Sequence, residues 1–242
     1  MSESVSAVIL AGGQGTRVNH LLPGLPKPMA PTAGRPFIEW IVRFLVGAGI
    51  EDIVLSTGHL GDVVAGHFAA HPVPGARVVC RREPGPLGTA GGFLHAIATH
   101  VSRPDFWFVL NGDSLALAKL SGFLNDVRSS GAAAGLLGVR VADASRFGTL
   151  EVDDDGCLIA FREKHPGAAL VNAGIYLLPS WTAESLPARR PLSFETDVFP
   201  RLLGRSQTVR VYQCEVPFID IGTPETLPLA ADFVTQHPNF FP

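Results

Sequence analysis

A short apolar run that ends in a cluster of glycines constrains this chain more than any other feature. Apart from Ser6, residues 5–10 are β-branched or apolar, and Gly12, Gly13 and Gly15 follow after Ala11. The run predicts a buried strand, and the glycines predict a tight loop. Backbone N–H groups in such a loop can approach a phosphate closely, and Arg17 adds a positively charged guanidinium group that can bind the same phosphate. The segment therefore indicates a phosphate-binding loop at the end of a first strand.

The rest of the first half alternates between strand-like and helix-like segments. Further strands are predicted at 53–56, 77–80 and 106–110, and helices over 36–46, 61–69 and 87–99. This alternation predicts parallel strands with covering helices.

The second half is richer in strands, and its pattern predicts a mixed sheet with an antiparallel lobe. Strand-like segments occupy 132–141, 148–152, 158–162 and 171–178, and later helices are predicted over 193–203 and 224–236. Ser193 and Thr223 are the expected N-caps of these two helices. Asp153 to Gly156 lie between two strands, where an Asp-Gly pair favours a hairpin turn over a metal site.

Bulk composition limits the classes of protein to which the chain can belong. With 242 residues, 46% of them hydrophobic, we expect one globular domain spanning 1–242. A net charge of −3 offers no broad basic face, so neither a nucleic acid nor a membrane is an expected partner. An odd cysteine count without a CxxC pair indicates free thiols, and no secretory leader is recognisable, so a cytoplasmic location is expected.

Two common nucleotide-binding motifs do not fit the glycine loop. No Gly-Lys-Ser/Thr follows it, which argues against a Walker loop, and Val18 stands where a dinucleotide-binding loop would need its third glycine. Residues 55–57 also lack the acidic residue that a dinucleotide site needs at the end of its second strand. The eight histidines form no metal-binding constellation, and we interpret them as surface residues. A glycine-rich turn without a ligand is the structural alternative for the loop.

Several motifs in order along the chain resemble those of sugar-1-phosphate nucleotidylyltransferases. They are LAGGQGTR at 10–17, LPKPMAPTAGRPFIEW at 25–40, PLGTAGG at 86–92, LNGDS at 110–114, FREK at 161–164, NAGIYL at 172–177 and FIDIGTPE at 218–225. Together with SFETDVFP at 193–200 they look most like D-glycero-D-manno-heptose 1-phosphate guanylyltransferases. The resemblance implies a Rossmann-like three-layer α/β sandwich with a mixed, mostly parallel central sheet and a small antiparallel lobe.

The same resemblance implies the reaction and its participants. A nucleoside monophosphate, from GTP in this subgroup, would pass to a sugar 1-phosphate with release of pyrophosphate, and Mg²⁺ would be the cofactor. Residues 1–115 would form the nucleotide-binding half and 116–242 the sugar-phosphate-binding half. A uridylyl or thymidylyl transferase and a nucleotide-sensing regulatory subunit are alternatives, because fold alone does not specify function. A homodimer is an assembly state that the sequence leaves open.

The motifs also assign candidate site residues. The predicted nucleotide-binding residues are Leu10, Ala11, Gly12, Gly13, Gly15, Thr16, Arg17, Glu83, Gly88 and Thr89. The predicted sugar-phosphate-binding residues are Gly148, Glu163, Lys164, Asn172 and Gly174. The predicted catalytic residues are Arg17, Lys27, Asp113 and Lys164, and the predicted metal ligands are Asp113 and Asp220.

Each assignment has a structural alternative. Lys27 lies between two prolines that restrict the backbone, and alone it would be a solvated loop lysine. Asp113 follows an apolar strand, where open α/β sheets bind ligands, but a lone aspartate there is usually a turn former. Asp220 could cap a helix. Glu163 and Lys164 could form a surface ion pair.

Overall fold

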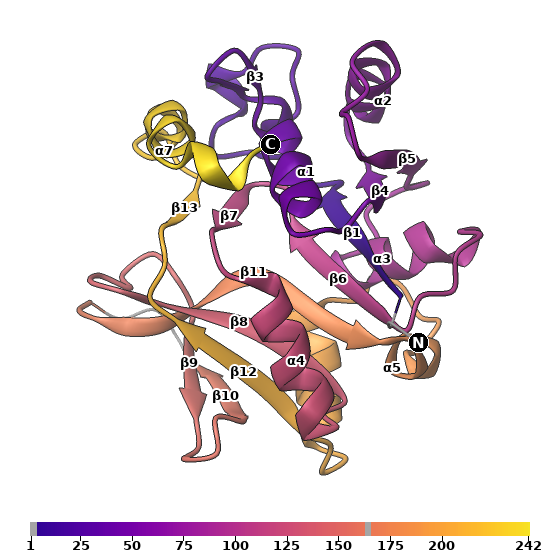
Figure 1. The fold of residues 1–242 in the computed structure, drawn as a ribbon, viewed down its shortest axis with the longest axis vertical. Coiled ribbons are helices and arrows are strands. Elements are labelled where there is room, and N and C mark those ends of the chain that lie inside the picture. The colour runs from indigo at the N-terminus through magenta and orange to yellow at the C-terminus, as the bar shows by residue number, and fades with distance from the viewer. Residues whose placement is uncertain (1–3, 163–165) are drawn as a thin grey trace.

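A mixed sheet of nine strands runs through the residues that the structure, a computed structural model, describes: 4–162 and 166–242 (Figure 1). Its strands are β1 (Val5–Ala11), β4 (Asp52–Thr57), β5 (Arg77–Arg82), β6 (Phe106–Asn111), β8 (Ala134–Val141), β9 (Thr149–Val152), β10 (Leu158–Arg162), β11 (Ala169–Pro179) and β12 (Val209–Cys214). β1 pairs in parallel with β4 and β6, and β5 pairs in parallel with β4. β11 runs antiparallel to β6 and β8 and so joins the two halves of the chain in one sheet.

Two further strand pairs lie outside this sheet. β2 (Pro31–Thr32) pairs with β3 (Arg35–Pro36), and β7 (Ser114–Ala116) pairs with β13 (Phe218–Asp220). The α-helices are α1 (Phe37–Gly47), α2 (Gly61–Ala70), α3 (Thr89–Ala98), α4 (Leu120–Ser130), α5 (Ser180–Ser185), α6 (Phe199–Leu203) and α7 (Ala230–Gln236). Shorter helical turns are η1 (Asn19–Leu21), η2 (Lys27–Met29), η3 (Phe194–Val198), η4 (Leu227–Leu229) and η5 (Pro238–Phe240).

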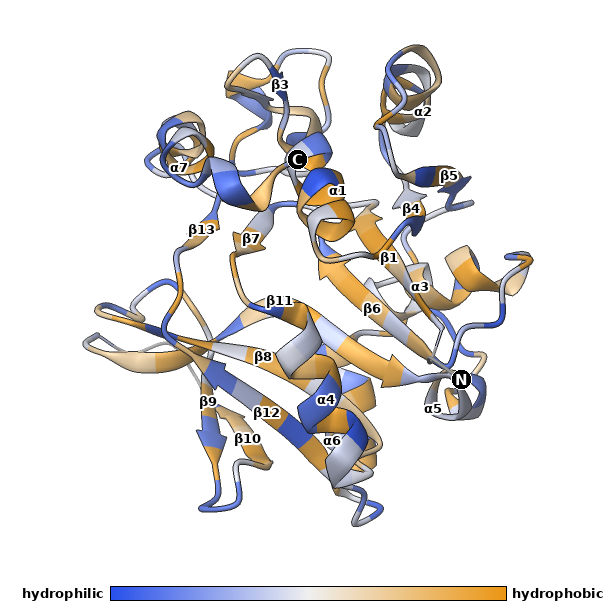
Figure 2. Ribbon diagram, viewed as in Figure 1, coloured by the Kyte–Doolittle hydropathy of each residue, from blue (hydrophilic) through white to orange (hydrophobic). Residues whose placement is uncertain are grey.

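Successive residues of the buried strands point to opposite faces of the sheet and are apolar on both. Helices therefore cover both faces. Ala7 and Ile9 of β1 face one core with residues of α1, α2 and α4, whereas Val8 faces a second core with residues of α3, α5 and α6. Figure 2 shows the resulting hydrophobic colouring along β1, β6 and β11. The predicted three-layer α/β fold with a mixed sheet is confirmed.

The predicted elements are present in the structure, but one helix begins later than predicted and several elements were not predicted. The helix expected from Pro224 begins instead at Ala230, because Pro228 lacks the N–H that a continuous helix would need there. Thr223 therefore caps no helix, and its carbonyl accepts a turn hydrogen bond from the Thr226 N–H. The helices and strands that the sequence pattern did not predict are α4, α5, β2, β3, β7, β12 and β13. β7 and β13 are only three residues each.

The histidines are not all on the surface, contrary to their interpretation from the sequence. His100 is 4% exposed, and its Nε2 lies 2.8 Å from the Asp52 carboxylate. The sequence did not show that His100 is buried, because its hydrogen-bond partner lies 48 positions away in the chain. By contrast, the Asp153 to Gly156 turn is confirmed, with the Gly156 N–H bonded to the Asp153 carbonyl. None of the helices in the two described ranges is long and apolar enough to cross a membrane.

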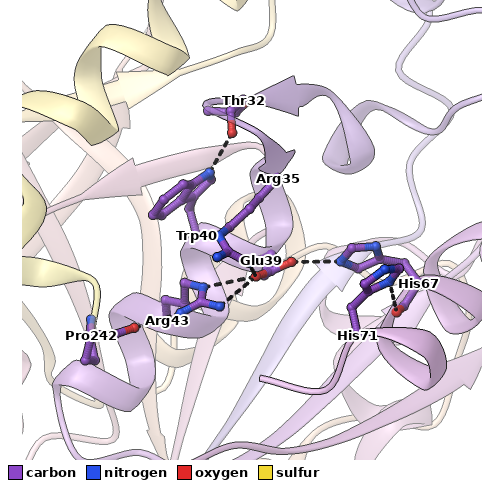
Figure 3. A network of polar contacts seen from close by, with 8 residues as sticks. All are labelled: Thr32, Arg35, Glu39, Trp40, Arg43, His67, His71 and Pro242. Carbon is purple, nitrogen blue, oxygen red and sulfur yellow. Dashed lines mark hydrogen bonds and ion pairs between the residues drawn. The ribbon is translucent and has the colours of Figure 1, made fainter. Parts of the chain in front are cut away.

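A buried carboxylate fixes α1 to its surroundings (Figure 3). Glu39 is 2% exposed and contacts Arg35, Arg43 and His67, with distances of 2.7 to 3.0 Å. Arg43 also donates to the carbonyl of Pro242, so α1 is tied both to α2 and to the last residue of the chain. This network anchors the helix that directly follows the segment bearing Lys27.

Replacing Glu39 by glutamine should destabilise the protein by about 2 kcal/mol at neutral pH, because charge-assisted hydrogen bonds are lost. Burial opposes ionisation of Glu39, but hydrogen bonds from His67, Arg43 and Arg35 outweigh it and lower the pKa of the carboxyl below 4.5. The stabilisation is therefore present above pH 4.5 and is lost as the pH falls through the lowered pKa. Denaturant unfolding at several pH values should show the difference between wild type and Glu39→Gln shrinking under acid. The exposed Glu184→Gln is the control, and a pH-independent difference would contradict the assignment.

Candidate active site

The carboxyl ends of β1 and β6 open into a cleft of about 420 Å³. Its lining residues are Leu10, Ala11, Gly12, Gly13, Gln14, Lys27, Pro28, Glu83, Pro86, Leu87, Gly88, Thr89, Asn111, Gly112 and Asp113. Parallel strands present their carboxyl ends and following loops at one edge of a sheet, which is where open α/β folds bind ligands. The cleft thus gathers the glycine loop, the lysine between prolines, the PLGTAGG loop and the LNGDS loop.

The glycine loop is packed so closely that two of its positions exclude a side chain. A Cβ on Gly12 would lie 2.4 Å from Oε1 of Glu83. Gly15 has a positive φ of 60°, and a Cβ there would lie 3.0 Å from Cβ of Lys27. These glycines therefore let the loop lie against Glu83 on one side and Lys27 on the other.

Lys27 and Asp113 form an ion pair across the cleft. Lys27 begins the short turn η2 after Pro26, so the prolines fix where the lysine side chain starts. The Lys27 and Asp113 side chains are 17% and 26% exposed, so both side chains remain partly accessible. The lysine is thus a cleft residue and not a solvated loop lysine.

Asp220 approaches Asp113 because β13 pairs with β7. In this pairing Asp220 lies opposite Ser114, and the Ile221 N–H donates to the Asp113 carbonyl at 2.9 Å. Burial raises the pKa of Asp220, and the negative charge of Asp113 raises it further. Two residues 107 positions apart therefore form one acidic pair.

The acidic pair suits a hard divalent cation. Its donors are carboxylate oxygens, and the repulsion that raises the pKa of Asp220 is what a bound cation would relieve. Among residues 4–162 and 166–242 no group of three or more His, Cys, Asp or Glu side chains could enclose a metal ion. Two carboxylates leave most of the coordination shell free, as Mg²⁺ requires when it also binds phosphate oxygens.

Glu83 lies beneath the glycine loop and is held by hydrogen bonds. Its Oε1 accepts from Oγ of Ser56 at 2.9 Å, and its carboxylate also accepts from the Leu87 N–H. Burial raises the pKa of Glu83, and these hydrogen bonds lower it only in part. A Cβ on Gly92 would lie 2.7 Å from the same oxygen. Glu83 therefore links the glycine loop to the loop that precedes α3, in addition to lining the cleft.

The loop that precedes α3 is fastened to the segment that precedes η3. The Leu192 N–H donates to the Leu87 carbonyl at 2.8 Å, and the Gly91 N–H donates to the Leu192 carbonyl at 3.0 Å. Gly88 has a φ of 76°, and a Cβ there would lie 2.4 Å from the Leu192 carbonyl oxygen. Only glycine therefore permits this approach of the two backbones.

Replacing Gly88 by alanine should disturb this loop strongly. The added Cβ meets backbone at a positive φ, so we expect a loss of about 1–3 kcal/mol of stability and weaker nucleotide binding. Gly85→Ala is a control in the same loop, because a Cβ there meets nothing within 4 Å. Thermal unfolding and nucleotide titration of both variants measure the difference. Equal behaviour of the two variants would contradict the proposed tight approach.

The predicted sugar-phosphate residues are only partly described. Asn172 and Gly174 lie on β11, where Oδ1 of Asn172 accepts from the Gly174 N–H at 2.9 Å. Gly174 has a φ of 72°, and a Cβ there would lie 2.4 Å from Nδ2 of Asn111. Gly148 is exposed just before β9. Glu163 and Lys164 lie outside the described residues.

A second pocket adjoins Asp220. Its lining includes Arg146, Phe147, Phe218 and Phe233. The Arg146 guanidinium lies 3.6 Å from the Asp220 carboxylate. Each member of the acidic pair thus has its own cationic neighbour, Lys27 for Asp113 and Arg146 for Asp220.

Most of the residues that line the cleft, but not all of them, were predicted from the sequence. The cleft also uses Gln14, Pro28, Pro86, Leu87, Asn111 and Gly112, which were not predicted as site residues. All of them lie within or beside the quoted motifs, so taking whole motifs as the site would have found them. Conversely, Gly15, Thr16 and Arg17 do not line the cleft, and Thr16 and Arg17 are exposed beyond its edge.

Comparisons with known proteins show the family to which the chain belongs. The chain is 36% identical over 227 residues to a mannose-1-phosphate guanylyltransferase of Mycobacterium tuberculosis, covering 93% of this chain and 63% of that relative. It is 32% identical over 228 residues to a D-glycero-alpha-D-manno-heptose 1-phosphate guanylyltransferase of Campylobacter jejuni, covering 91% and 96%. The crystal structure of HddC from Yersinia pseudotuberculosis complexed with GMP-PN superimposes with a TM-score of 0.83 at 28% identity, covering 95% and 98%. Residues 6–237 match the family profile described as nucleotidyl transferase, and the chain belongs to this family.

Proposed function

We propose that this protein transfers GMP from GTP to a sugar 1-phosphate, with D-glycero-D-manno-heptose 1-phosphate as the preferred acceptor, and releases pyrophosphate. The observation that carries the proposal is the cleft that unites the glycine loop, Lys27 and Asp113, with Asp220 beside them. The names of the relatives support a guanylyl transfer, and the Campylobacter jejuni relative is matched over 96% of its length. That relative supports a heptose acceptor.

The roles of the residues follow from where charge lies in the reaction. A phosphate oxygen of the sugar 1-phosphate attacks the α-phosphorus of GTP, forming the new P–O bond while the bond to pyrophosphate breaks. The glycine-loop N–H groups, Arg17 and Lys27 would stabilise the negative charge on the leaving pyrophosphate. No protein nucleophile is needed, because the attacking phosphate is already ionised near neutral pH.

Asp113 and Asp220 would hold Mg²⁺. When bound, this ion supplies positive charge to the phosphate oxygens of the nucleotide. Asp113 would have a second task, because its ion pair with Lys27 holds the ammonium within the cleft. Lys164 would position the sugar phosphate, and Asn172 and Gly174 would contact the sugar.

A substrate matrix tests the proposal. Purified protein with Mg²⁺ is combined with each of GTP, CTP, UTP, ATP and dTTP and with the 1-phosphates of heptose, mannose and glucose, and pyrophosphate release is measured. GTP with heptose 1-phosphate should give the highest kcat/KM. Preference for UTP or dTTP would overturn the guanylyl assignment, and preference for mannose 1-phosphate would overturn the heptose assignment. A chain that binds nucleotide without releasing pyrophosphate would instead be a nucleotide-sensing regulatory subunit.

A further inference from the structure

The motif SFETDVFP contains a glutamate that contacts both halves of the molecule. Glu195 lies in η3, the helical turn that begins after Ser193. Its Oε2 accepts from Oγ1 of Thr89 at 3.1 Å, and Thr89 lines the cleft at the start of α3. Its Oε1 accepts from the Tyr176 hydroxyl at 2.6 Å, and Tyr176 belongs to β11. One carboxylate thus links α3 to β11, and its Oε2 also accepts from Oγ of Ser193 at 2.7 Å.

On the nucleotide side, Glu195 completes the attachment of the loop that precedes α3. Thr89 Oγ1 donates to Glu195 and accepts from the Phe194 N–H at 2.9 Å. Two backbone hydrogen bonds also join Leu192 to Leu87 of this loop and to Gly91 in the first turn of α3. The segment preceding η3 therefore fixes where the loop enters α3. The Thr89 hydroxyl therefore has both a donor and an acceptor partner inside the protein.

On the sugar side, a fully buried tyrosine continues the chain of hydrogen bonds. Tyr176 is 0% exposed, and its hydroxyl accepts from Nδ2 of Asn172 at 3.0 Å. Burial raises the pKa of Tyr176 well above 10, and the charge of Glu195 raises it further, so the hydroxyl keeps its proton and donates. Oδ1 of Asn172 then accepts from the Gly174 N–H. These two hydrogen bonds fix the orientation of the Asn172 amide.

We propose that Glu195 is a positioning residue for the transfer reaction, which holds Thr89 of the nucleotide side and Asn172 of the sugar side in one fixed relation. This inference rests on the proposed function. An in-line displacement needs its attacking oxygen and leaving group aligned, and a displacement of 1 Å can cost about 100-fold in rate. A rigid hydrogen-bonded bridge between the two binding halves supplies that alignment without touching the reacting atoms.

The chemistry of a glutamate suits this bridge. A carboxylate accepts hydrogen bonds at both oxygens, so it can accept from the Tyr176 and Thr89 hydroxyls at the same time. Glutamine would replace one of these oxygens with a donor, and alanine would leave the Thr89, Tyr176 and Ser193 hydroxyls without this acceptor. Glu195→Gln should therefore lose part of the alignment, and Glu195→Ala more of it.

The test compares steady-state kinetics of Glu195→Ala, Glu195→Gln, Thr89→Val and Tyr176→Phe with wild type, using GTP and heptose 1-phosphate. We expect Glu195→Ala to lower kcat/KM for both substrates by 10- to 100-fold, following the misplacement cost above. Thr89→Val and Tyr176→Phe should each lower kcat, because either one breaks the connection between the two sides. In addition, Thr89→Val should raise KM mainly for GTP, and Tyr176→Phe mainly for the sugar phosphate. Tyr176→Phe keeps the buried ring, so it stays informative even where Glu195→Ala unfolds.

A double-mutant cycle separates a bridge from two independent contacts. With Glu195 present, Thr89→Val and Tyr176→Phe combined should cost less than the product of their single effects, because either one already interrupts the bridge. In the Glu195→Ala background each should have little further effect. Asp126→Asn is the control: this half-buried carboxylate pairs with Arg210 and joins α4 to β12, so its loss should leave kcat/KM unchanged.

Multiplicative effects in the cycle, or a Glu195→Ala enzyme that behaves like Asp126→Asn, would overturn the bridge while leaving the proposed function intact. Failure of the wild type to release pyrophosphate with any substrate pair would overturn both. Loss of thermal stability with unchanged kcat/KM in the folded fraction would assign Glu195 to the fold alone and so also overturn the inference.

Discussion

Asp113→Asn is expected to lower kcat by about 1000-fold or more, the largest effect of any substitution considered for this protein. The change removes one of two carboxylates proposed to bind Mg²⁺, and the metal contributes several kcal/mol of charge stabilisation in the transition state. It also removes the charge that pairs with Lys27. Pyrophosphate release as a function of Mg²⁺ concentration measures both the rate and the metal requirement.

The same substitution should leave the fold intact. β13 is attached at this point through the Asp113 backbone carbonyl, which accepts from the Ile221 N–H and is unchanged by the substitution. Circular dichroism and thermal unfolding should therefore match wild type. Asp62→Asn is the control, because Asp62 forms an exposed ion pair with Arg82 and should keep full activity. Near-normal turnover of Asp113→Asn would refute its assigned role.

Arg17→Ala is expected to lower kcat by roughly 100- to 1000-fold, as the loss of one charged contact in a phosphoryl-transfer transition state does. Arg17 is exposed at the far end of the glycine loop and takes part in none of the ion pairs found within 4–162 and 166–242. Its removal should therefore leave stability unchanged. Single-turnover measurements with GTP separate the loss in chemistry from any loss in binding.

The matched control for this prediction is Arg201→Ala, an exposed arginine on α6. Both variants lose one surface charge, but only Arg17 follows the phosphate-binding loop. Equal rates for the two variants would show that Arg17 has no catalytic part, and the stabilisation of pyrophosphate would then rest on Lys27 and the glycine-loop N–H groups.

Local sequence was sufficient where the residues of a feature are close together in the chain. The glycine loop follows its strand directly, and Lys27 lies only twelve positions beyond Gly15. Their juxtaposition in the cleft follows from the short connection and the flanking prolines. The β9–β10 turn was equally predictable, because the Asp-Gly pair specifies its geometry locally.

Local sequence was insufficient where a feature depends on strand pairing or on burial. Pro228 delayed α7 by six residues against the predicted start at Pro224, and His100 is buried through a distant aspartate. The two short strands β7 and β13 give too weak a pattern to recognise, although they bring the acidic pair together. Hydrogen-bond partners of this kind are set by the whole fold and leave no local periodicity.

The amino-acid sequence by itself determined the α/β class, most of the strands of the central sheet and the motifs that carry the family resemblance, because hydrophobic periodicity and glycine placement act over a few residues. Only the tertiary structure decided that Asp220 lies beside Asp113, and that Glu195 reaches both Thr89 and Tyr176. The physical reason is that a carboxylate acquires its role from the charges and hydrogen-bond donors around it, and here those come from strands and turns far apart in the chain.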